Sequence, residues 1–266
     1  MSQGYTLTFL GTGTSTGVPQ IGCRCQTCTS ADPRDKRLRA SAIVTTPKGN
    51  NFLIDCGPDF RAQMLAQGSP RLDAALLTHT HYDHVGGIDD MRPYCAQGPF
   101  PVYCEPNVAD DLRHRVPYCF AEHLYPGVPT FTLHNIDRNK PFTVRGEEVV
   151  PLPVMHAKLP IVGFRFGPLA YITDCKTMPE ETYALLRDLD VLVINALRHE
   201  PHMSHISLSE ALQIIDRVKP RRAYLTHMAH QMGPHAQCSQ LLPPNVFFAY
   251  DGLTVQAADA CVSPCR

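Results

Sequence analysis

The stretch from Thr78 to His84 concentrates metal-binding side chains: it reads THTHYDH and holds three histidines and one aspartate. An apolar run at 74–77 precedes it and two glycines at 86–87 follow it. The run predicts a buried strand, and the glycines allow a tight turn. Roughly 0.002 such motifs are expected by chance in a shuffled chain of this composition, so chance is not a serious alternative. Imidazole and carboxylate ligands suit zinc, manganese or iron, so the stretch predicts a metal site.

The spacing of these side chains suggests two ions rather than one. Alternate residues of an extended segment project to the same side, so His79 and His81 can share one ion. Asp83 and His84, beyond the strand end, can turn toward a second. Three further candidates each follow an apolar run that predicts a strand: His156, Asp174 and His227. Because these strand ends are expected at one edge of a sheet, the seven side chains together predict a two-metal centre.

A second cluster consists of Cys23, Cys25 and Cys28, spaced as C-x-C-x2-C on a polar loop. Three cysteines this close predict a structural zinc site, which needs a fourth ligand from elsewhere in the chain. The chain has 11 cysteines, an odd number. Reduced thiols and a metal site are therefore a simpler account than a set of disulfides.

Composition predicts an ordinary globular protein. Of the 266 residues, 44% are hydrophobic and 18% are charged, and the net charge is −1. The near-neutral net charge does not provide the excess of positive charge that binding long nucleic acid requires. A metal site can still attract small anions. No apolar window is long enough to span a bilayer, so we expect no membrane contact. The first residues lack the features of a signal peptide, so we expect a cytoplasmic location.

The elements that position these ligands are strands interleaved with a few helices. Apolar patterns predict strands over 5–9, 41–46, 51–55, 74–78, 101–104, 148–155, 162–166, 169–173, 190–195, 223–226 and 246–250. Helices are predicted over 59–67, 107–115, 177–189 and 207–218, the last two with capping signatures at 177–180 and 207–210. The region 117–141 is irregular and we make no prediction for it. The pattern fits an α/β fold, a four-layer αββα sandwich, with one domain over 1–256 and a tail over 257–266.

With this ligand set, the chain resembles the metallo-β-lactamase superfamily in its binuclear form over about residues 5–255. The resemblance implies that one metal is held by His79, His81 and His156, and the other by Asp83, His84 and His227. It also implies that Asp174 bridges the two metals and that Asp55 orients the ligands without contacting a metal itself. True β-lactamases usually lack the equivalent of His84.

Within the superfamily, the chain is most similar to the PhnP-like cyclic phosphodiesterases of the carbon-phosphorus lyase pathway. Four segments carry the likeness: 11–19, 23–28, 55–58 and 225–231. In that subfamily three cysteines and a histidine three residues after the last ligand hold a structural zinc. The resemblance therefore implies His230 as the fourth ligand beside the cysteines.

The resemblance implies a binuclear phosphodiesterase that hydrolyses a small cyclic phosphate through a metal-bridging hydroxide. Phosphoribosyl 1,2-cyclic phosphate and a 2′,3′-cyclic nucleotide are the expected substrates, and zinc, manganese or iron the expected active-site ions. Asp83 is assigned to catalysis as a ligand. His205 resembles the histidine that superfamily phosphodiesterases place near the phosphate, as general acid or phosphate-orienting residue. His199 and His202 are close enough in sequence to share that role, and Asp89, Asp90 and Arg92 are candidate substrate contacts.

Other activities use the same ligands. A thiolester or lactone hydrolase of the glyoxalase II or lactonase type is one alternative, against which His205 and the cysteine cluster count. A tRNA 3′-end nuclease is another, disfavoured by the near-neutral charge and the lack of a long basic arm. A purely structural role for the metals would not require seven ligands around a shared position. The physiological substrate, the native metals and the oligomeric state are open, with a homodimer as one option.

Overall fold

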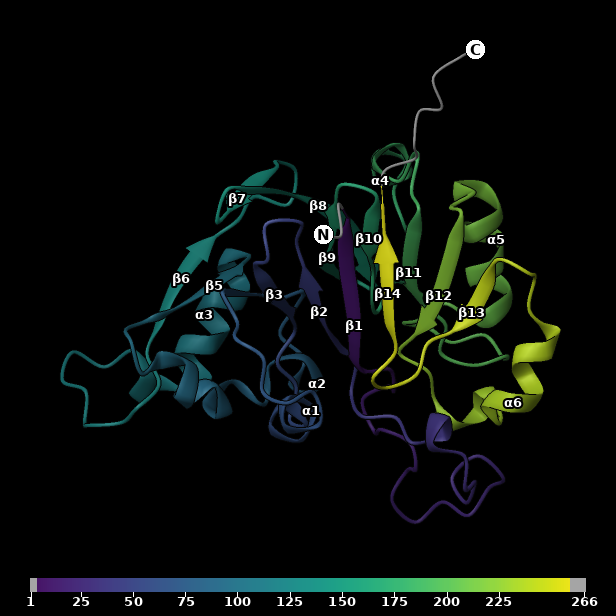
Figure 1. Ribbon diagram of the computed structural model, residues 1–266, viewed down its shortest axis with the longest axis horizontal. Coiled ribbons are helices and arrows are strands. Elements are labelled where there is room, and N and C mark those ends of the chain that lie inside the picture. The colour runs from purple at the N-terminus through teal and green to yellow at the C-terminus, as the bar shows by residue number, and fades with distance from the viewer. Residues whose placement is uncertain (1–3, 259–266) are drawn as a thin grey trace.

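Two seven-stranded sheets form the centre of the protein in a computed structural model that describes residues 4–258 (Figure 1). The first sheet has the order β14-β1-β2-β3-β4-β5-β6 and the second the order β13-β12-β11-β10-β9-β8-β7. Each sheet takes up a continuous half of the chain, apart from β14, which returns to pair with β1. The two-halves pattern in the sequence therefore corresponds to the two sheets.

The strands of the first sheet are β1 (Tyr5–Gly11), β2 (Ser41–Thr45), β3 (Asn51–Ile54), β4 (Ala74–Leu76), β5 (Phe100–Cys104), β6 (Phe131–Asn135) and β14 (Thr254–Ala257). Those of the second are β7 (Phe142–Val144), β8 (Glu147–His156), β9 (Leu159–Phe166), β10 (Leu169–Tyr171), β11 (Val191–Asn195), β12 (Arg222–Thr226) and β13 (Val246–Phe248). Both sheets are mixed: β3 to β6 and β10 to β13 are parallel runs, and the other pairs are antiparallel.

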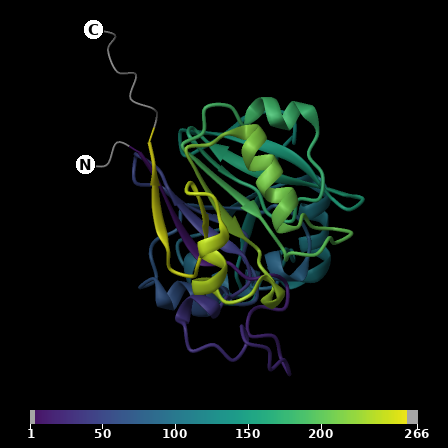
Figure 2. The ribbon, with the colours of Figure 1, turned by 90° about the vertical axis from the view of Figure 1, so that its right-hand side faces the viewer.

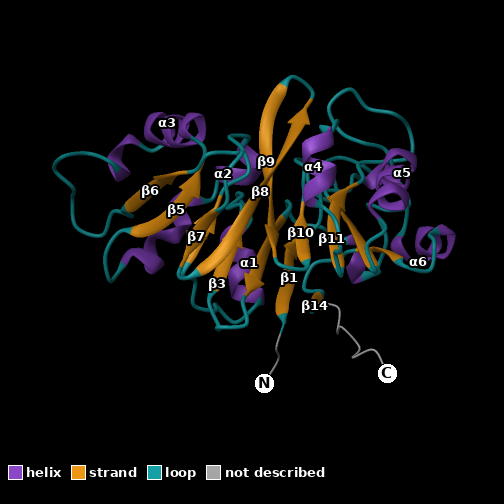
Figure 3. Ribbon diagram, turned by 90° about the horizontal axis from the view of Figure 1, so that it is seen from above, coloured by secondary structure: helices purple, strands orange, loops and turns teal. Residues whose placement is uncertain are grey.

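The α-helices are α1 (Phe60–Ala66), α2 (Tyr82–Val85), α3 (Pro106–Arg115), α4 (Glu180–Leu185), α5 (Leu208–Val218) and α6 (His235–Cys238). Short 3₁₀ turns are η1 (Pro33–Asp35), η2 (Ile88–Cys95), η3 (Pro117–Cys119), η4 (His230–Met232) and η5 (Ser239–Leu241). Helices α1 and α3 lie on the outer side of the first sheet, and α4 and α5 on the outer side of the second (Figures 2 and 3). Among residues 4–258, no helix is long and apolar enough to cross a membrane.

Three apolar cores lie between the four layers and pack them together. The core between the sheets includes Phe9, Phe52 and Phe164, all fully buried. A second core, with Phe60 of α1, packs the first sheet against its helices, and a third, with Ile215 of α5, does the same for the second sheet. Burial of apolar area in three stacked interfaces is the main source of stability in such a fold. The predicted four-layer αββα sandwich is confirmed.

Some element boundaries differ from the predictions. The helix predicted over 177–189 begins at Glu180 and ends at Leu185. Pro179 rather than Thr177 occupies its N-cap, because Thr177 pairs with Met155 in an isolated β-bridge. The unassigned region 117–141 contains η3 and β6. Ala257, predicted to begin the tail, pairs with Tyr5 in β14, and the rest of the predicted tail from 259 onward lies outside the described residues.

Candidate metal centre

The predicted ligands, and Asp55 that supports them, meet at one edge of the two sheets. Asp55 follows β3, His156 ends β8 and His227 follows β12. Asp83 and His84 lie on α2, at the lower edge of the first sheet in Figure 1. Neighbouring parallel strands present their carboxyl ends at the same edge of a sheet, so these side chains share one space between the sheets.

Three histidines form one side of this cluster. The ring centroid of His79 lies 4.6 Å from that of His81 and 5.8 Å from that of His156. The rings of His81 and His156 are 5.0 Å apart. His79 and His156 are buried, whereas His81 is exposed and opens this side of the cluster to solvent. These are the three side chains that the resemblance groups around one ion.

Asp83, His84 and His227 form the other side. Asp83 Oδ2 lies 3.2 Å from His84 Nε2 and 3.5 Å from His227 Nε2. Asp174 reaches the same nitrogens, with Oδ2 3.0 Å from His84 Nε2 and Oδ1 3.2 Å from His227 Nε2. Potential ligand atoms of Asp83, His84 and His227 all lie within 4.8 Å of one another, as do those of His79, His84 and Asp174. The aspartate that the resemblance assigns as a bridge therefore lies between the two groups.

Hydrogen bonds behind the rings determine which nitrogens face the cluster. His84 Nδ1 donates to Asp55 Oδ2 at 2.7 Å. The Thr78 hydroxyl donates to the same carboxylate oxygen at 2.8 Å, so it accepts from His79 Nδ1 at 2.9 Å. Both rings therefore turn Nε2 inward, where neither Nε2 has a hydrogen-bond partner although both are buried. Buried ligand nitrogens of this kind fit a metal ion, which would satisfy them.

The electrostatics of the cluster also favour a cation. Burial alone would lower the pKa of His84, but Asp174, Asp55 and Asp83 outweigh it and raise the pKa well above its usual range. Burial would raise the pKa of Asp174, but His227 and His84 hold it well below its usual value. The carboxylate of Asp174 thus stays ionised, and its negative charge in a buried site is stabilised by nearby positive charge. Divalent ions held by the seven side chains would supply that charge.

Three residues of the site adopt the left-handed backbone region that L-residues rarely occupy. Asp55 has φ 60°, Asp174 has φ 54° and His227 has φ 54°. Each follows a strand, so the backbone turns sharply at the point where the side chain enters the cluster. Strain of this kind, on the order of 1–3 kcal/mol per residue, is typical of functional sites, where surrounding structure enforces it.

Gly57 explains why the segment after Asp55 is tightly constrained. A Cβ atom at Gly57 would lie 2.1 Å from the carbonyl oxygen of Asp83, so no larger residue fits there. The close approach also allows Cys56 N to donate to His84 O at 2.7 Å. The loop after β3 and the ligand helix α2 are therefore packed backbone to backbone.

His205 lies among the ligands. Its ring centroid is 4.6 Å from that of His156 and 5.0 Å from that of His227, and its Nδ1 is 3.4 Å from Asp174 Oδ1. Burial, together with the nearby His227, lowers the pKa of His205 to about 3, so the ring is neutral at physiological pH. The structure brings this predicted residue into contact with both sides of the cluster.

The cysteine cluster lies on the loop between β1 and β2. Cys23 Sγ and Cys25 Sγ are 3.4 Å and 3.2 Å from His230 Nδ1, and with Cys28 the four ligand atoms lie within 4.8 Å of one another. The backbone N–H of Cys28 lowers the pKa of the Cys25 thiol to about 6. A Cys₃His group with an acidic thiol fits a structural zinc.

The structure does not bring Asp89 or Arg92 to the cluster. They form an ion pair at 2.8 Å on η2, and Arg92 donates to Gly127 O while Asp89 accepts from Tyr118 Oη. These contacts tie down the loop after α3. Asp90 is exposed on the same turn. Their predicted role in substrate binding stays a prediction, and a role in holding this loop accounts for the contacts of Asp89 and Arg92.

Two supporting residues received no role from the sequence. Thr78 connects Asp55 to His79, and Asn195 binds both the N–H and the C=O of Cys175, directly after Asp174. Thr78 lies just after β4, directly before His79, whereas Asn195 ends β11, which carries no predicted ligand. A polar residue at the end of a strand, next to a predicted ligand, is the signal that could have identified Thr78; Asn195 is far from Asp174 in sequence.

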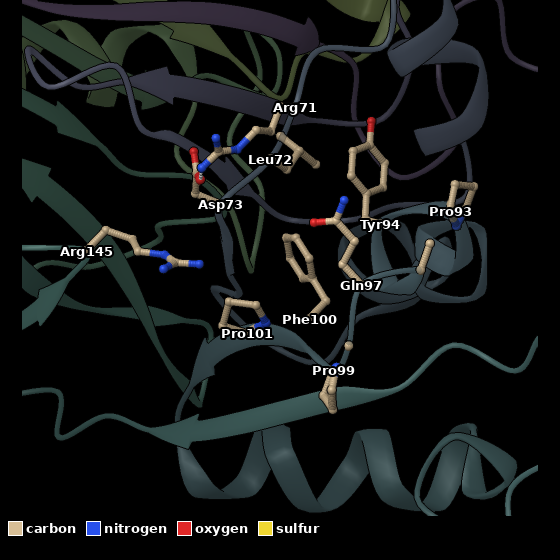
Figure 4. Close-up of a pocket in the computed structure, with 12 residues that line it drawn as sticks. Arg71, Leu72, Asp73, Pro93, Tyr94, Gln97, Pro99, Phe100, Pro101 and Arg145 are labelled. Carbon is tan, nitrogen blue, oxygen red and sulfur yellow. Dashed lines mark hydrogen bonds and ion pairs between the residues drawn. The ribbon is translucent and has the colours of Figure 1, made fainter.

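A large cavity lies away from this centre. It has a volume of about 730 Å³ and is bordered by the residues that begin β4 and β5, at the opposite ends of the strands from the ligands. Arg145 points into it, Arg71 turns toward its ion-pair partner Asp73, and Tyr94 and Phe100 form an aromatic wall (Figure 4). No histidine lines it, so cavity size does not identify the chemical site here.

Comparison with known proteins places the chain in a family. A model of the beta-lactamase superfamily domain matches residues 50–228, from β3 through the last ligand strand. The chain belongs to the metallo-β-lactamase superfamily. The predicted membership is confirmed, and the His/Asp cluster at the sheet edge is that of a metallo-β-lactamase-fold hydrolase.

Solved structures share both the fold and, in one case, much of the sequence. The crystal structure of a new diphosphatase from the PhnP family is 38% identical, with a TM-score of 0.89 over 95% of this chain and 96% of that one. Zinc-bound PqqB from Methylobacterium extorquens is 23% identical, with a TM-score of 0.76 over 94% of this chain and 99% of that one. The second likeness shows the fold alone.

Among curated proteins, the octanoyltransferase of Porphyromonas gingivalis is 43% identical over 246 residues, which make up 92% of this chain and 50% of that protein. The chain spans half or less of the length of the first curated relatives it matches. The name of such a relative can therefore refer to a part that this chain does not match.

Proposed function

We propose that this protein is a binuclear metal-dependent phosphodiesterase that hydrolyses a small cyclic phosphate. The observation that carries the proposal is the position of His205, buried between His156 on one side of the ligand cluster and His227 on the other. A substrate oxygen that reaches both ions would lie beside this ring. A hydrogen-bond donor there suits an anionic phosphoryl group, in line with the likeness to a PhnP-family diphosphatase.

The chain's own residues divide the work. The seven ligands, from His79 to His227, would hold two ions of zinc or manganese, with iron as a further candidate. Such ions supply Lewis-acid activation of water and of the phosphoryl oxygen. Asp55 and Thr78 keep two ligand rings in one tautomer and orientation. As a neutral ring, His205 donates a hydrogen bond to a phosphoryl oxygen; to give a proton to the leaving alkoxide, it would first have to take one up when the anionic substrate binds.

A diphosphate bond is a second candidate for cleavage. The similar solved structure is named as a diphosphatase, and 38% identity over nearly the whole of both chains makes a related substrate plausible on chemical grounds. Phosphodiesters and diphosphates both offer a charged, tetrahedral phosphoryl group, which ions held by the seven ligands would bind. They differ in the leaving group, which is an alkoxide in one and a phosphate in the other.

A thiolester is the alternative from another reaction class. The relative named octanoyltransferase is the observation that favours it. The neutral, planar acyl group of a thiolester does not require a second buried donor beside the ions. We therefore rank it below the phosphoryl substrates.

The test is turnover by the zinc-loaded and the manganese-loaded protein of five compounds. They are bis(p-nitrophenyl) phosphate, a 2′,3′-cyclic nucleotide, ADP-ribose, S-lactoylglutathione and an octanoyl thiolester. We expect the cyclic nucleotide and bis(p-nitrophenyl) phosphate to be cleaved with the highest kcat/KM. Preference for ADP-ribose would move the assignment to diphosphates, and preference for either thiolester would overturn the phosphodiesterase proposal.

The two roles open to His205 can be separated with one variant. His205→Ala that slows an alkyl ester by about 100-fold or more and a p-nitrophenyl ester far less would identify proton donation, because p-nitrophenolate leaves without a proton. Equal losses with both esters would identify a role in orienting the phosphate. Unchanged rates with both would remove His205 from the mechanism.

A further inference from the structure

Four imidazole rings lie in a column that runs from the ligand cluster to the surface. His84 and His227 stack with centroids 5.6 Å apart and planes 14° apart. His227 and His205 follow at 5.0 Å and 29°, and His205 and His202 at 5.3 Å and 28°. The first three rings are buried, whereas His202 is partly exposed. The outermost ring therefore stands where the site meets solvent.

The hydrogen bonds of His202 specify which nitrogen it offers. The backbone N–H of Ser204 donates to His202 Nδ1 at 3.3 Å, and Ser204 Oγ lies 3.1 Å from the same atom. A backbone N–H can only donate, so Nδ1 is the acceptor and the proton of the neutral ring is on Nε2. No protein acceptor for that Nε2–H occurs among residues 4–258. His202 thus presents one oriented, unused donor.

The neighbouring histidine is not available in this way. His199 Nε2 lies 3.0 Å from the carbonyl oxygen of Met232, which accepts from it and ties the segment before His202 to η4. The structure therefore separates two residues that the sequence could not. His199 holds the loop and His202 faces the solvent side of the site.

Arg198 places a positive charge near His202. Burial lowers the pKa of His202 first, and Arg198 lowers it further, so the ring is neutral at physiological pH. Lys176 also lies near, but its charge is paired with Glu210 at 2.7 Å. Arg198 donates to the carbonyl oxygens of Glu200 and Pro201, which fixes its guanidinium near this loop. A neutral donor in a positive field is suited to an anionic oxygen.

We propose that His202 is a substrate-binding residue whose Nε2–H donates to an anionic group that the substrate carries beyond the scissile phosphorus, such as a second phosphate. The inference rests on the proposed function, because it takes the metal cluster as the place where the first phosphoryl group is cleaved. The stacked ring of His205 then separates the reacting group from the second anion. His202 would favour substrates with two charged groups over those with one.

The test uses a matched pair of substrates, 2′,3′-cyclic AMP with and without a 5′-phosphate. We expect His202→Ala to raise KM for the 5′-phosphorylated compound by about tenfold, the usual effect of losing a hydrogen bond to a charged group. The KM for the compound without the 5′-phosphate, and kcat for both, should change less than about twofold. His202→Gln, which keeps an N–H near the position of Nε2, should restore most of the loss.

His199→Gln serves as the control, since it lies in the same segment but faces η4. Metal content and melting temperature of each variant show whether the fold and the ions are retained. Equal KM changes with both substrates, or none, would overturn the assignment of His202 while leaving the phosphodiesterase proposal intact. Wild-type protein that cleaves neither cyclic phosphate would overturn both proposals.

Discussion

The two metal-binding clusters of this protein are built in different ways. The His/Asp cluster stands on strand ends and the short helix α2, and six of its seven predicted ligands are buried; only His81 is exposed. The three cysteines of the Cys₃His group stand on the loop between β1 and β2, where Cys25 is exposed, and His230 begins the short turn η4. The strands and α2 position the side chains of the first cluster, whereas the second cluster would fix the position of a loop.

The second role follows from what the cysteine loop touches. Its start pairs with the segment after the last ligand, since Gly13 and Met228 form a parallel bridge and Thr14 N donates to Met228 O. His230 lies two residues further on. A zinc ion bound to His230 and three cysteines would lock the loop onto the segment that carries His227. On this comparison, the His/Asp cluster is suited to chemistry, and a zinc ion in the Cys₃His group would maintain the geometry of one ligand strand.

The largest effect is expected from Asp174→Asn, which changes the residue at the centre of the first cluster. Asp174 oxygens reach both His84 and His227, so an amide in its place removes a negative charge that both ions would share. We expect kcat/KM to fall by at least about 100-fold, more than the usual loss for a residue behind the ligands. Metal analysis should show fewer active-site ions and an unchanged zinc content in the cysteine cluster. Retention of full activity would show that Asp174 is not needed to bind the active-site metals.

Cys25→Ser should break the second cluster and spare the first. Loss of one zinc equivalent is expected to cost on the order of 3 kcal/mol, which lowers the melting temperature by roughly 6–12 °C for a chain of this size. Activity should fall less than about tenfold. The control is Cys95→Ser, because Cys95 lies outside the cluster and its hydroxyl replacement can still donate to Thr130 O. A Cys25→Ser protein with its full complement of metal would contradict the structural-zinc assignment.

Thr78→Val tests the support behind the ligands. Valine matches the shape of threonine but lacks the hydroxyl that links Asp55 to His79. We expect about a tenfold loss of active-site metal affinity, measured by competition with a chelator, and a parallel loss of activity at limiting metal. Thr78→Ser keeps the hydroxyl and should behave as wild type. Equal affinities for all three proteins would mean that the fold alone orients His79.

The strands that carry ligands were predictable because they are short apolar runs followed by polar residues. The runs ending near Asp55, His156 and His227 were all placed within a few residues. Strands β6, β7 and β14 were missed because they are short and pair at or next to a sheet edge, where side chains are partly exposed. An edge strand lacks the continuous apolar pattern that identifies a buried one.

The ligand set of the site was predictable for a similar reason, but its supporting shell was not. Residue type and motif spacing identify metal ligands in a sequence. The partner of a ligand can come from any element that folding brings near, as Asn195 does for the segment after Asp174. The same limit applied to His199 and His202, which differ in their contacts because Met232 O accepts from His199. Distances between elements, which the sequence does not contain, decide such roles.

The smallest effect is expected at the start of α5, two residues after His205. Ser207 caps the helix: its hydroxyl accepts from Glu210 N and its N–H donates to the Glu210 carboxylate at 2.7 Å, as the sequence predicted. Ser207→Ala should cost about 1 kcal/mol and lower the melting temperature by roughly 2–4 °C. Because His205 is also buried against His156 and His227, kcat/KM should stay within about twofold of wild type. Gln213→Ala, at an exposed position of the same helix, is the control. A tenfold loss of activity in Ser207→Ala alone would show that the helix cap, rather than packing against the ligands, positions His205.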